Sequence, residues 1–270
     1  MTDGSIIITG ASGGMGSAAT RALAAKGFRI IMACKDLDKA SRVRDSIIRE
    51  VPGAELELRE IHLDSFASIR EFAAGMEGVQ LAGLFNNAGT LPRRYSLSED
   101  GFEMTLAVNY IGPYLLTRLL LPKLSDGAAV VNMVSLSAKY VRFSRDILHP
   151  AEKDFGQLGA YATSKLALIY FTAALAARCP ALKVNAADPG IVNTDIIRLD
   201  RWFDPLTDII FRPFCKSPEH GAAPAVRALC SDVSGKYFSG KRFRDIPSHY
   251  ASRTEDIAWL WDATAREVGL

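Results

Sequence analysis

Two short segments contain the residue types and spacings that chemistry at a nucleotide cofactor requires. The first is TGASGGMG, from Thr9 to Gly16, and the second is YATSK, from Tyr161 to Lys165. Glycines let a backbone approach phosphate oxygens closely, and the N-terminus of a following helix offers unpaired N–H groups to an anion. A phenol and an ammonium four residues apart lie on one face of a helix. The first segment is therefore a candidate cofactor site, and the second is a candidate proton-transfer pair.

Alternating strands and helices are needed to position these two segments. Apolar runs predict strands at 6–8, 29–33, 55–63, 81–86, 128–134, 182–186 and 236–239. Amphipathic stretches predict helices at 17–26, 36–50, 65–76, 99–124, 158–178 and 218–231, and a charged helical tail from 253, with Asp36 as an N-cap. Apolar strands that alternate with helices favour an α/β fold, a doubly wound parallel sheet (Rossmann fold) of about seven strands with helices on both faces. We expect one domain over residues 1–270.

Composition narrows the class of protein further. Hydrophobic residues make up 49% of the chain, and the net charge is only +2, without a basic run that would favour nucleic acid as a partner. Four scattered cysteines lack the spacing of a metal site, which favours reduced thiols. The first predicted strand begins almost at the N-terminus, so we expect no signal peptide, and we expect no membrane anchor. We expect a soluble, cytoplasmic protein without a metal.

The candidate residues follow the ends of predicted strands, where doubly wound sheets bind their ligands. The glycine spacing is T-G-x-x-x-G-x-G, and further motifs follow it in order: NNAG (86–89), Asn109, a serine after the fifth strand, Y-x-x-x-K and P-G-x-V-x-T. This ordered set resembles the short-chain dehydrogenase/reductase family. ACKD (33–36), the long gap before Tyr161 and VSGKYFS (233–239) most resemble its retinol-dehydrogenase-like branch.

The resemblance implies a hydride transfer in which an alkoxide must gain or lose a proton. It assigns the catalytic set Asn109, Ser135, Tyr161 and Lys165, with Tyr161 as the general acid/base and Asn109 on a water-held proton relay. Lys165, about 5 Å away at an effective dielectric near 20, would favour the phenolate by about 3 kcal/mol. Ser135 would hydrogen-bond the substrate oxygen, although Ser137 remains an alternative for this role.

The end of the second predicted strand bears on which dinucleotide binds. Cys34 stands where NAD-preferring relatives have aspartate, and Lys35 offers a cation to a ribose 2′-phosphate. Asp36 is explained by its N-cap role, so we expect NADP(H) rather than NAD(H). The predicted cofactor contacts are Gly10, Ser12, Gly13, Gly14, Met15, Gly16, Lys35, Leu63, Asp64, Asn87, Ala88, Gly89, Tyr161, Lys165, Pro189, Gly190, Val192 and Thr194.

The segment at about 190–218 is the predicted substrate-binding lobe. It combines large apolar side chains with three arginines and with Pro205 and Pro213, which is consistent with a lid over a lipophilic substrate, a static cover or a subunit contact in a homo-oligomer. The leading hypothesis is an NADP(H)-dependent oxidoreductase that interconverts a small-molecule carbonyl and alcohol. The alternatives are a non-catalytic NADP(H)-binding sensor or regulatory subunit, and an enzyme of the same family that reduces a carbon–carbon double bond.

Overall fold

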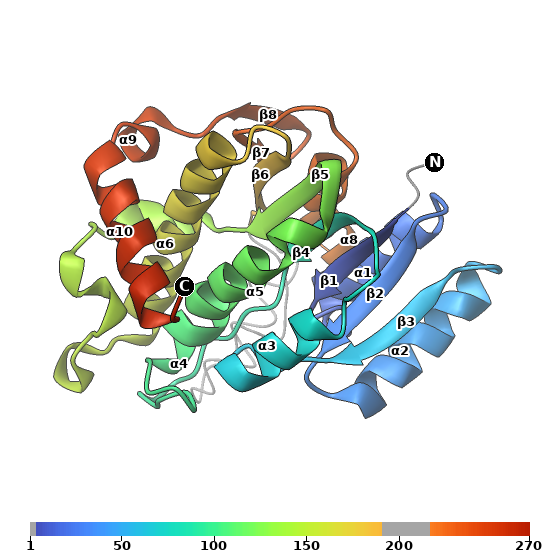
Figure 1. The fold of residues 1–270 in the computed structure, drawn as a ribbon, viewed down its shortest axis with the longest axis horizontal. Coiled ribbons are helices and arrows are strands. Elements are labelled where there is room, and N and C mark those ends of the chain that lie inside the picture. Colours follow the sequence, from blue (N-terminus) through green and yellow to red (C-terminus); the bar gives the residue numbers. More distant parts are fainter. Residues whose placement is uncertain (1–3, 191–216) are drawn as a thin grey trace, which may run out of the picture.

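The computed structural model describes residues 4–190 and 217–270, and its centre is one eight-stranded sheet (Figure 1). The strand order is β3-β2-β1-β4-β5-β6-β7-β8. The first seven strands run parallel, and β8 pairs antiparallel with β7. The strands are β1 (Ser5–Thr9), β2 (Arg29–Cys34), β3 (Leu56–Glu60), β4 (Leu81–Asn86), β5 (Leu124–Met133), β6 (Lys183–Asp188), β7 (Lys236–Ser239) and β8 (Arg242–Asp245). The predicted α/β, doubly wound fold is confirmed.

Helices cover both faces of this sheet. The longer ones are α1 (Gly14–Ala24), α2 (Leu37–Glu50), α3 (Phe66–Ala74), α5 (Gly112–Leu120), α6 (Gln157–Arg178), α8 (Pro218–Leu229) and α10 (Thr254–Glu267). The short elements are α4 (Met104–Leu106), η1 (Ala107–Ile111), η2 (Leu121–Lys123), η3 (Leu136–Tyr140), η4 (Arg145–Leu148), η5 (Glu152–Asp154) and α9 (Ser248–Ala251). Asp36 caps α2 as predicted, since its carboxylate accepts a hydrogen bond from Lys39 N at 2.8 Å.

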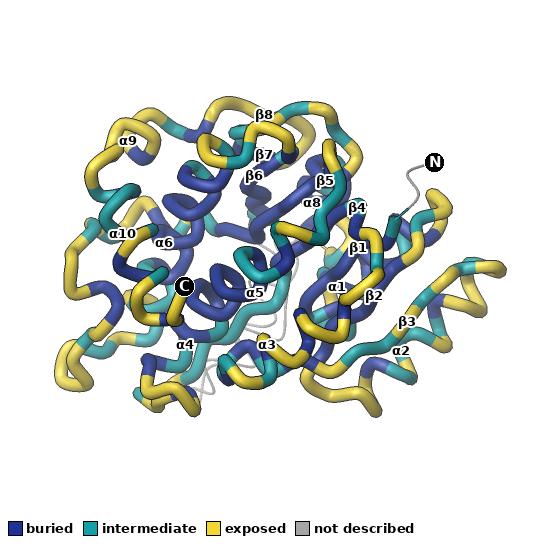
Figure 2. Tube along the Cα trace, in the orientation of Figure 1, coloured by how far each residue is buried: buried dark blue, intermediate teal, exposed yellow. Residues whose placement is uncertain are grey.

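The core divides into two apolar layers, one on each face of the sheet. Successive side chains of a strand point to opposite faces, so Ile6 and Ile8 pack with α1 and α8, whereas Ile7 packs on the face that α3, α5 and α6 cover. The strands are buried through the centre of the molecule, and the exposed residues lie mainly on outer helix faces and loops (Figure 2). Burial on both faces explains why the central strands are continuous apolar runs.

The strand order changes sides at β1: β2 and β3 lie on one side of β1, and β4 and the later strands lie on the other. The crossovers on either side of β1 lead away from each other, so a crevice opens beyond the carboxyl ends of β1 and β4. The glycine-rich turn follows β1, and Asn87, Ala88 and Gly89 follow β4. The topology therefore brings two of the predicted cofactor segments to the same edge of the sheet.

The prediction of about seven strands, all parallel, was one strand short. The additional strand, β8, forms a tight hairpin with β7 around Gly240, whose φ of 54° is a left-handed conformation that glycine adopts readily. All four residues of β8 are exposed, and only Phe243 is a large apolar residue. An exposed edge strand of this kind has no alternating apolar pattern, so the sequence did not indicate it.

The predicted continuous helix over 99–124 was wrong at both ends and in its middle. Regular helix begins at Met104, where the Glu103 carboxylate caps it by accepting hydrogen bonds from Thr105 N and Leu106 N. Residues 107–111 form a π-helical turn, η1, before α5 begins. Pro113 has no N–H to donate to the carbonyl of Asn109 four residues earlier, which disrupts the α-helical ladder at this point. Regular helix ends at Leu120, and Leu124 already belongs to β5.

Among the described residues, α6 is the one helix whose length and mean hydropathy would suffice to cross a membrane. Two thirds of its apolar stretch (67%) is buried inside the molecule, against β5, β6 and α10. Its composition is thus accounted for by packing in the core, and this helix carries Tyr161 and Lys165.

Candidate active site

The glycine-rich turn after β1 is held in shape by the segment after β4. The Thr9 hydroxyl oxygen accepts hydrogen bonds from Asn87 N and Ala88 N, both at 3.0 Å, and the Asn87 amide donates to Thr9 O at 2.9 Å. Gly10 has a φ of 64°, and a Cβ on it would lie 3.0 Å from the Cα of Ala88. Gly13 caps α1 without a side-chain hydrogen bond, so the first N–H groups of α1 remain available to a phosphate.

Gly16 is the position in this turn that tolerates a side chain least. A Cβ there would lie 2.2 Å from Gly10 O and 2.8 Å from the Asn87 amide nitrogen. We expect Gly16→Ala to displace the turn and weaken dinucleotide binding at least tenfold by calorimetry. Gly159→Ala is the matched control, because Gly159 is exposed in α6 with open space around its Cα, and it should bind normally. Equal affinities of the two variants would contradict this role of the turn.

A cavity of about 250 Å³ continues from the glycine-rich turn across the ends of β2 and the segment after β3. Its lining includes six of the predicted cofactor contacts: Gly10, Lys35, Leu63, Asp64, Ala88 and Gly89. Lys35 Nζ forms an ion pair with Asp64 Oδ2 at 3.0 Å, and the Lys35 side chain is 63% exposed. In addition, Asn87 Oδ1 is a buried oxygen without a hydrogen-bond partner among the described residues. The donors, the glycines and the hollow fit a dinucleotide that lies along this edge.

Lys165 and Tyr161 occupy successive turns of α6 beside the carboxyl end of β5. Lys165 Nζ is buried, donates to Met133 O at 2.8 Å and lies 5.5 Å from the centroid of the Tyr161 ring. A Cβ built on Gly89 would lie 3.8 Å from Lys165 Nζ, which brings the segment after β4 into contact range of the pair. The two halves of the predicted site therefore meet in the folded chain.

The pKa values of this pair differ from what their spacing alone suggested. Burial lowers the pKa of the Lys165 ammonium to about 8. Burial also raises the pKa of the Tyr161 phenol above its usual value, and a hydrogen bond from Ser135 opposes this only in part. The predicted net shift toward phenolate was thus wrong, because it considered the attraction of two charges and omitted the free energy of removing the phenolate from water.

Ser135 is the serine that lies beside Tyr161. Its side chain lowers the pKa of the Tyr161 phenol, and its oxygen accepts from Ser137 N at 3.2 Å and from the Ser137 hydroxyl at 3.1 Å. Ser137 therefore supports Ser135 from the next turn of the chain. This arrangement favours Ser135 over Ser137 for contact with the substrate oxygen.

Asn109 connects the segment after β4 to α6. Its amide oxygen accepts from Thr90 N at 2.7 Å, and its amide nitrogen donates to Thr90 O at 3.0 Å and to the Ser164 hydroxyl at 3.1 Å. The side chain is fully buried, and its amide is satisfied by these bonds. Asn109 thereby fixes the position of α6, and its main chain lies in the π-helical turn η1.

The sequence matches the family described as short chain dehydrogenase over residues 5–201. This chain belongs to the short-chain dehydrogenase family. It is 36% identical to retinol dehydrogenase 13 of Homo sapiens, with 98% of this chain and 84% of that protein covered. It is also 36% identical to retinol dehydrogenase 11 of Homo sapiens, with coverage of 98% and 86%. These relatives place it in the retinol-dehydrogenase-like branch.

The fold also matches solved structures of short-chain dehydrogenases and related proteins. An uncharacterized protein from Mycobacterium paratuberculosis superimposes with a TM-score of 0.78 at 29% identity, over 98% of this chain and 93% of that one. A candidate NAD(P)-dependent gluconate 5-dehydrogenase from Beutenbergia cavernae, with NADP bound at low occupancy, gives a TM-score of 0.68 at 25% identity, over 87% and 94%. The chain is therefore an oxidoreductase that acts on CH–OH groups with NAD(P).

The remaining predicted cofactor contacts of this short-chain dehydrogenase lie around the start of α1, after β6, or outside the described residues. Ser12, Gly14 and Met15 lie in the turn that leads into α1 or in its first residues, and Pro189 and Gly190 follow β6. Val192, Thr194 and most of the predicted 190–218 lobe lie outside the described residues. Within residues 4–190 and 217–270, no three His, Cys, Asp or Glu side chains are grouped closely enough to hold a metal.

Sequence reasoning overlooked three residues of this site. Thr90 and Ser164 are the partners of Asn109, and Asp188 is a buried carboxylate at the end of β6. Ser164 stands inside the YATSK segment, and Asp188 begins the DPGIVNTD segment, so both had a positional signal. No sequence signal pointed to Thr90, because it hydrogen-bonds Asn109 through its main chain.

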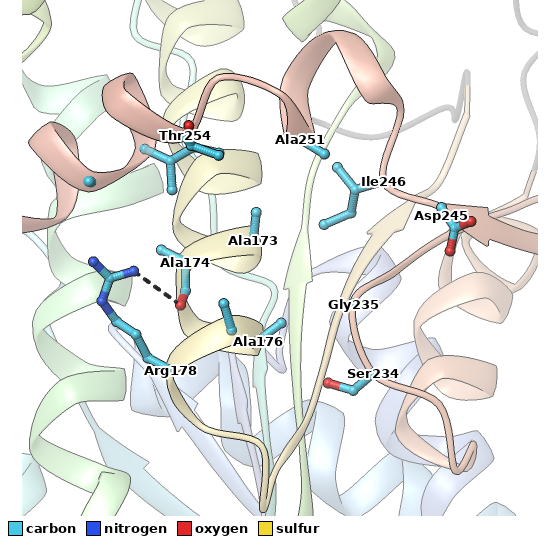
Figure 3. A pocket seen from close by; sticks show the side chains of 13 residues that line it. Ala173, Ala174, Ala176, Arg178, Ser234, Gly235, Asp245, Ile246, Ala251 and Thr254 are labelled. Carbon is cyan, nitrogen blue, oxygen red and sulfur yellow. Dashed lines mark hydrogen bonds between the residues drawn. The ribbon is translucent and has the colours of Figure 1, made fainter.

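A separate apolar cleft of about 550 Å³ lies at the other end of α6 (Figure 3). Its lining includes Ala173, Ala174 and Ala176 of α6, together with Ile246 and Ala251 (Figure 3). Ala176 is fifteen residues from Tyr161 along a straight helix, about 22 Å at the rise of an α-helix. This cleft is therefore too far from Tyr161 to hold a reacting carbonyl.

Proposed function

We propose that this short-chain dehydrogenase is an NADP(H)-dependent enzyme that interconverts a carbonyl and an alcohol on a lipophilic small molecule, with Tyr161 as the general acid/base. The observation that carries the proposal is the position of the buried Lys165 ammonium, whose Nζ lies 5.5 Å from the centre of the Tyr161 ring on the same helix. Ser135 is the hydroxyl side chain that lowers the pKa of this phenol. Such a phenol can protonate an alkoxide, whereas a protein that only binds the dinucleotide needs no proton donor.

Each side chain has a distinct task in this proposal. Bound NADPH would supply the hydride to the carbonyl carbon. The Ser135 hydroxyl would donate a hydrogen bond to the carbonyl oxygen and orient it toward the phenol. Tyr161 would give its proton to the oxygen as negative charge develops, and Lys165 would stabilise the resulting phenolate. Asn109 would keep α6 in place through Ser164.

Lys35 supports the preference for NADP(H). It is an exposed cation at the end of β2, and the Asp36 carboxylate already accepts a hydrogen bond from Lys39 N as the N-cap of α2. A 2′-phosphate would compete with Asp64 for the Lys35 ammonium. The neighbouring Cys34 thiol is buried and cannot replace the missing carboxylate.

We expect Lys35→Ala to weaken NADPH binding by about tenfold to a hundredfold, the equivalent of about 1.5–3 kcal/mol for a hydrogen bond to a charged group. NADH binding should change little, because NADH lacks the 2′-phosphate. Isothermal calorimetry with both dinucleotides measures the difference, and Lys26→Ala, an exposed lysine just beyond α1, is the control. Wild-type protein that binds NADH as tightly as NADPH would refute the preference.

The lipophilic substrate is supported by the names of the relatives, which are retinol dehydrogenases, and by the apolar composition of 190–218. NADPH oxidation in the presence of retinoids, steroids, aliphatic aldehydes and quinones would test it directly. Turnover only with small polar carbonyls would contradict the lipophilic substrate. NADPH binding without turnover of any carbonyl would favour the sensor alternative, and turnover confined to an activated alkene would favour double-bond reduction.

A further inference from the structure

A cavity of about 560 Å³ lies between η3, α6 and α9, and the proposed mechanism does not use it. Three of the side chains that line it are exposed cations: Lys139, Arg142 and Arg253. Asp256 is the one carboxylate among its described lining residues. With His249 neutral, the lining therefore has an excess of two positive charges.

The cations of this cavity are not compensated by the protein. No ion pair between one of them and a carboxylate occurs within residues 4–190 and 217–270. The Lys139 ammonium lies 4.8 Å from the centroid of the exposed Tyr140 ring, a contact that leaves its charge in place. Asp256 belongs to the first turn of α10, where a carboxylate stabilises the positive end of the helix dipole. The positive charge of the cavity is thus available to an anion.

Tyr170 supplies a second, independent indication of a ligand. Its side chain lines the same cavity and is only 3% exposed, yet its hydroxyl has no hydrogen-bond partner in the part of the chain that the structure describes. A buried phenol hydroxyl normally has such a partner. Phe143 packs on the Tyr170 ring with 5.4 Å between the centroids, and Leu166 continues this apolar wall. The cavity therefore combines cations, an unused donor and an apolar wall.

Helix α6 separates this cavity from the candidate active site. Tyr170 comes nine residues after Tyr161, which is two and a half turns of an α-helix and about 13 Å along its axis. Half a turn reverses the direction of a side chain, so the two phenols point to opposite sides of α6. A molecule in the cavity would not take the place of the reacting carbonyl or of the dinucleotide.

The size and the chemistry of the cavity define the class of ligand. A volume of about 560 Å³ is typical of small-molecule sites. Arginine side chains match the geometry of phosphate oxygens, and a phosphate monoester carries about two negative charges at neutral pH. We propose that this cavity binds a small phosphate monoester. Lys139, Arg142, Arg253 and the Tyr170 hydroxyl hold the phosphate, and the apolar part of the ester packs on Phe143.

Calorimetry with phenyl phosphate as the probe tests this site. The buffer contains no phosphate, and a saturating dinucleotide fills the cofactor site, so binding to the glycine-rich turn does not contribute. Phenyl sulfate has nearly the same shape but one negative charge less, and we expect it to bind at least tenfold more weakly. Inorganic phosphate, which lacks the ring, should bind several-fold more weakly than phenyl phosphate. Equal affinities for phenyl phosphate and phenyl sulfate would overturn the charge argument and the proposal with it.

Substitutions locate the binding. We expect Arg142→Gln to weaken phenyl phosphate binding at least tenfold, because a charge-assisted hydrogen bond is lost. Tyr170→Phe should weaken it about fivefold, and the fold should be unaffected because the deleted oxygen has no partner within the chain. Arg49→Gln is the matched control, since Arg49 is an exposed arginine of α2, far from α9 (Figure 1), and it should bind as wild type does.

The possible contrary results are distinct from one another. Equal affinities of Arg142→Gln and Arg49→Gln, or binding that disappears once the dinucleotide site is filled, would overturn the inference. Sedimentation of the protein with phosphatidic acid vesicles that phenyl phosphate prevents would assign the cavity to a lipid head group and overturn the soluble ligand. None of these measurements uses turnover, so their failure would leave the proposed function untouched, and an inactive enzyme would leave this site untouched.

Discussion

Replacing Tyr161 with phenylalanine is expected to lower kcat for carbonyl reduction at least a hundredfold while the affinity for NADPH stays within about twofold of wild type. The substitution deletes one oxygen, which is the proposed proton donor. The ring remains, so its packing in α6 is retained. Stopped-flow measurement of NADPH oxidation gives kcat, and calorimetry gives the affinity.

The control for this experiment is on the same helix. Tyr170→Phe removes a phenol that is also buried in α6 but lies more than two turns away from Tyr161. It should retain most of the activity. Substantial turnover by Tyr161→Phe would eliminate the proposed acid and require another proton donor in the site.

The second large effect concerns Lys165, for which activity and stability should change in opposite directions. We expect Lys165→Met to lower kcat by roughly a thousandfold, because the phenolate loses its neighbouring cation. At pH 7 the same variant should have a free energy of unfolding about 2 kcal/mol higher than wild type. Wild type loses about 3 kcal/mol by burying an ammonium whose pKa falls from 10.5 to about 8, and the variant loses about 1 kcal/mol with the bond to Met133 O.

The pH dependence of this stability difference has a definite sign. Lys165 binds its proton more weakly in the folded than in the unfolded chain, so the wild-type free energy of unfolding rises as pH increases from about 8 to 10.5. The advantage of Lys165→Met is therefore greatest below pH 8 and disappears toward pH 10.5. Urea titrations at several pH values measure it, with the exposed Lys26→Met as control. A gap independent of pH would show that the Lys165 ammonium is not destabilised by burial.

Secondary structure was predictable where one physical signal dominated. The central strands are buried on both faces, and their apolar runs, such as Ile6–Ile8 in β1, are the direct result. Helix α2 was predictable because Asp36 has the chemistry of an N-cap. The signal failed for β8, which is exposed, and for residues 99–124, where Glu103 and Pro113 impose caps and a π-helical turn that hydrophobic periodicity does not report.

The candidate site was predictable to the extent that its residues share motifs. The positions of Gly10, Gly16, Tyr161 and Lys165 follow from spacing, because a glycine-rich turn and a helical i, i+4 pair are local structures. The partners of these residues were not predictable. Thr90 contacts Asn109 through its main chain, and such a contact leaves no trace in side-chain identity.

The sequence by itself determined which groups are available: a glycine-rich turn before a helix, a phenol and an ammonium on one helical face, and a cation after the second strand. The tertiary structure decided the state of these groups. Burial in α6 lowers the pKa of Lys165 to about 8, and the same burial, together with the charge of Asp188, raises the pKa of Tyr161. The strength of an electrostatic interaction depends on the solvent that folding removes and on the charges that it brings together from distant parts of the chain, and neither quantity is a property of local sequence.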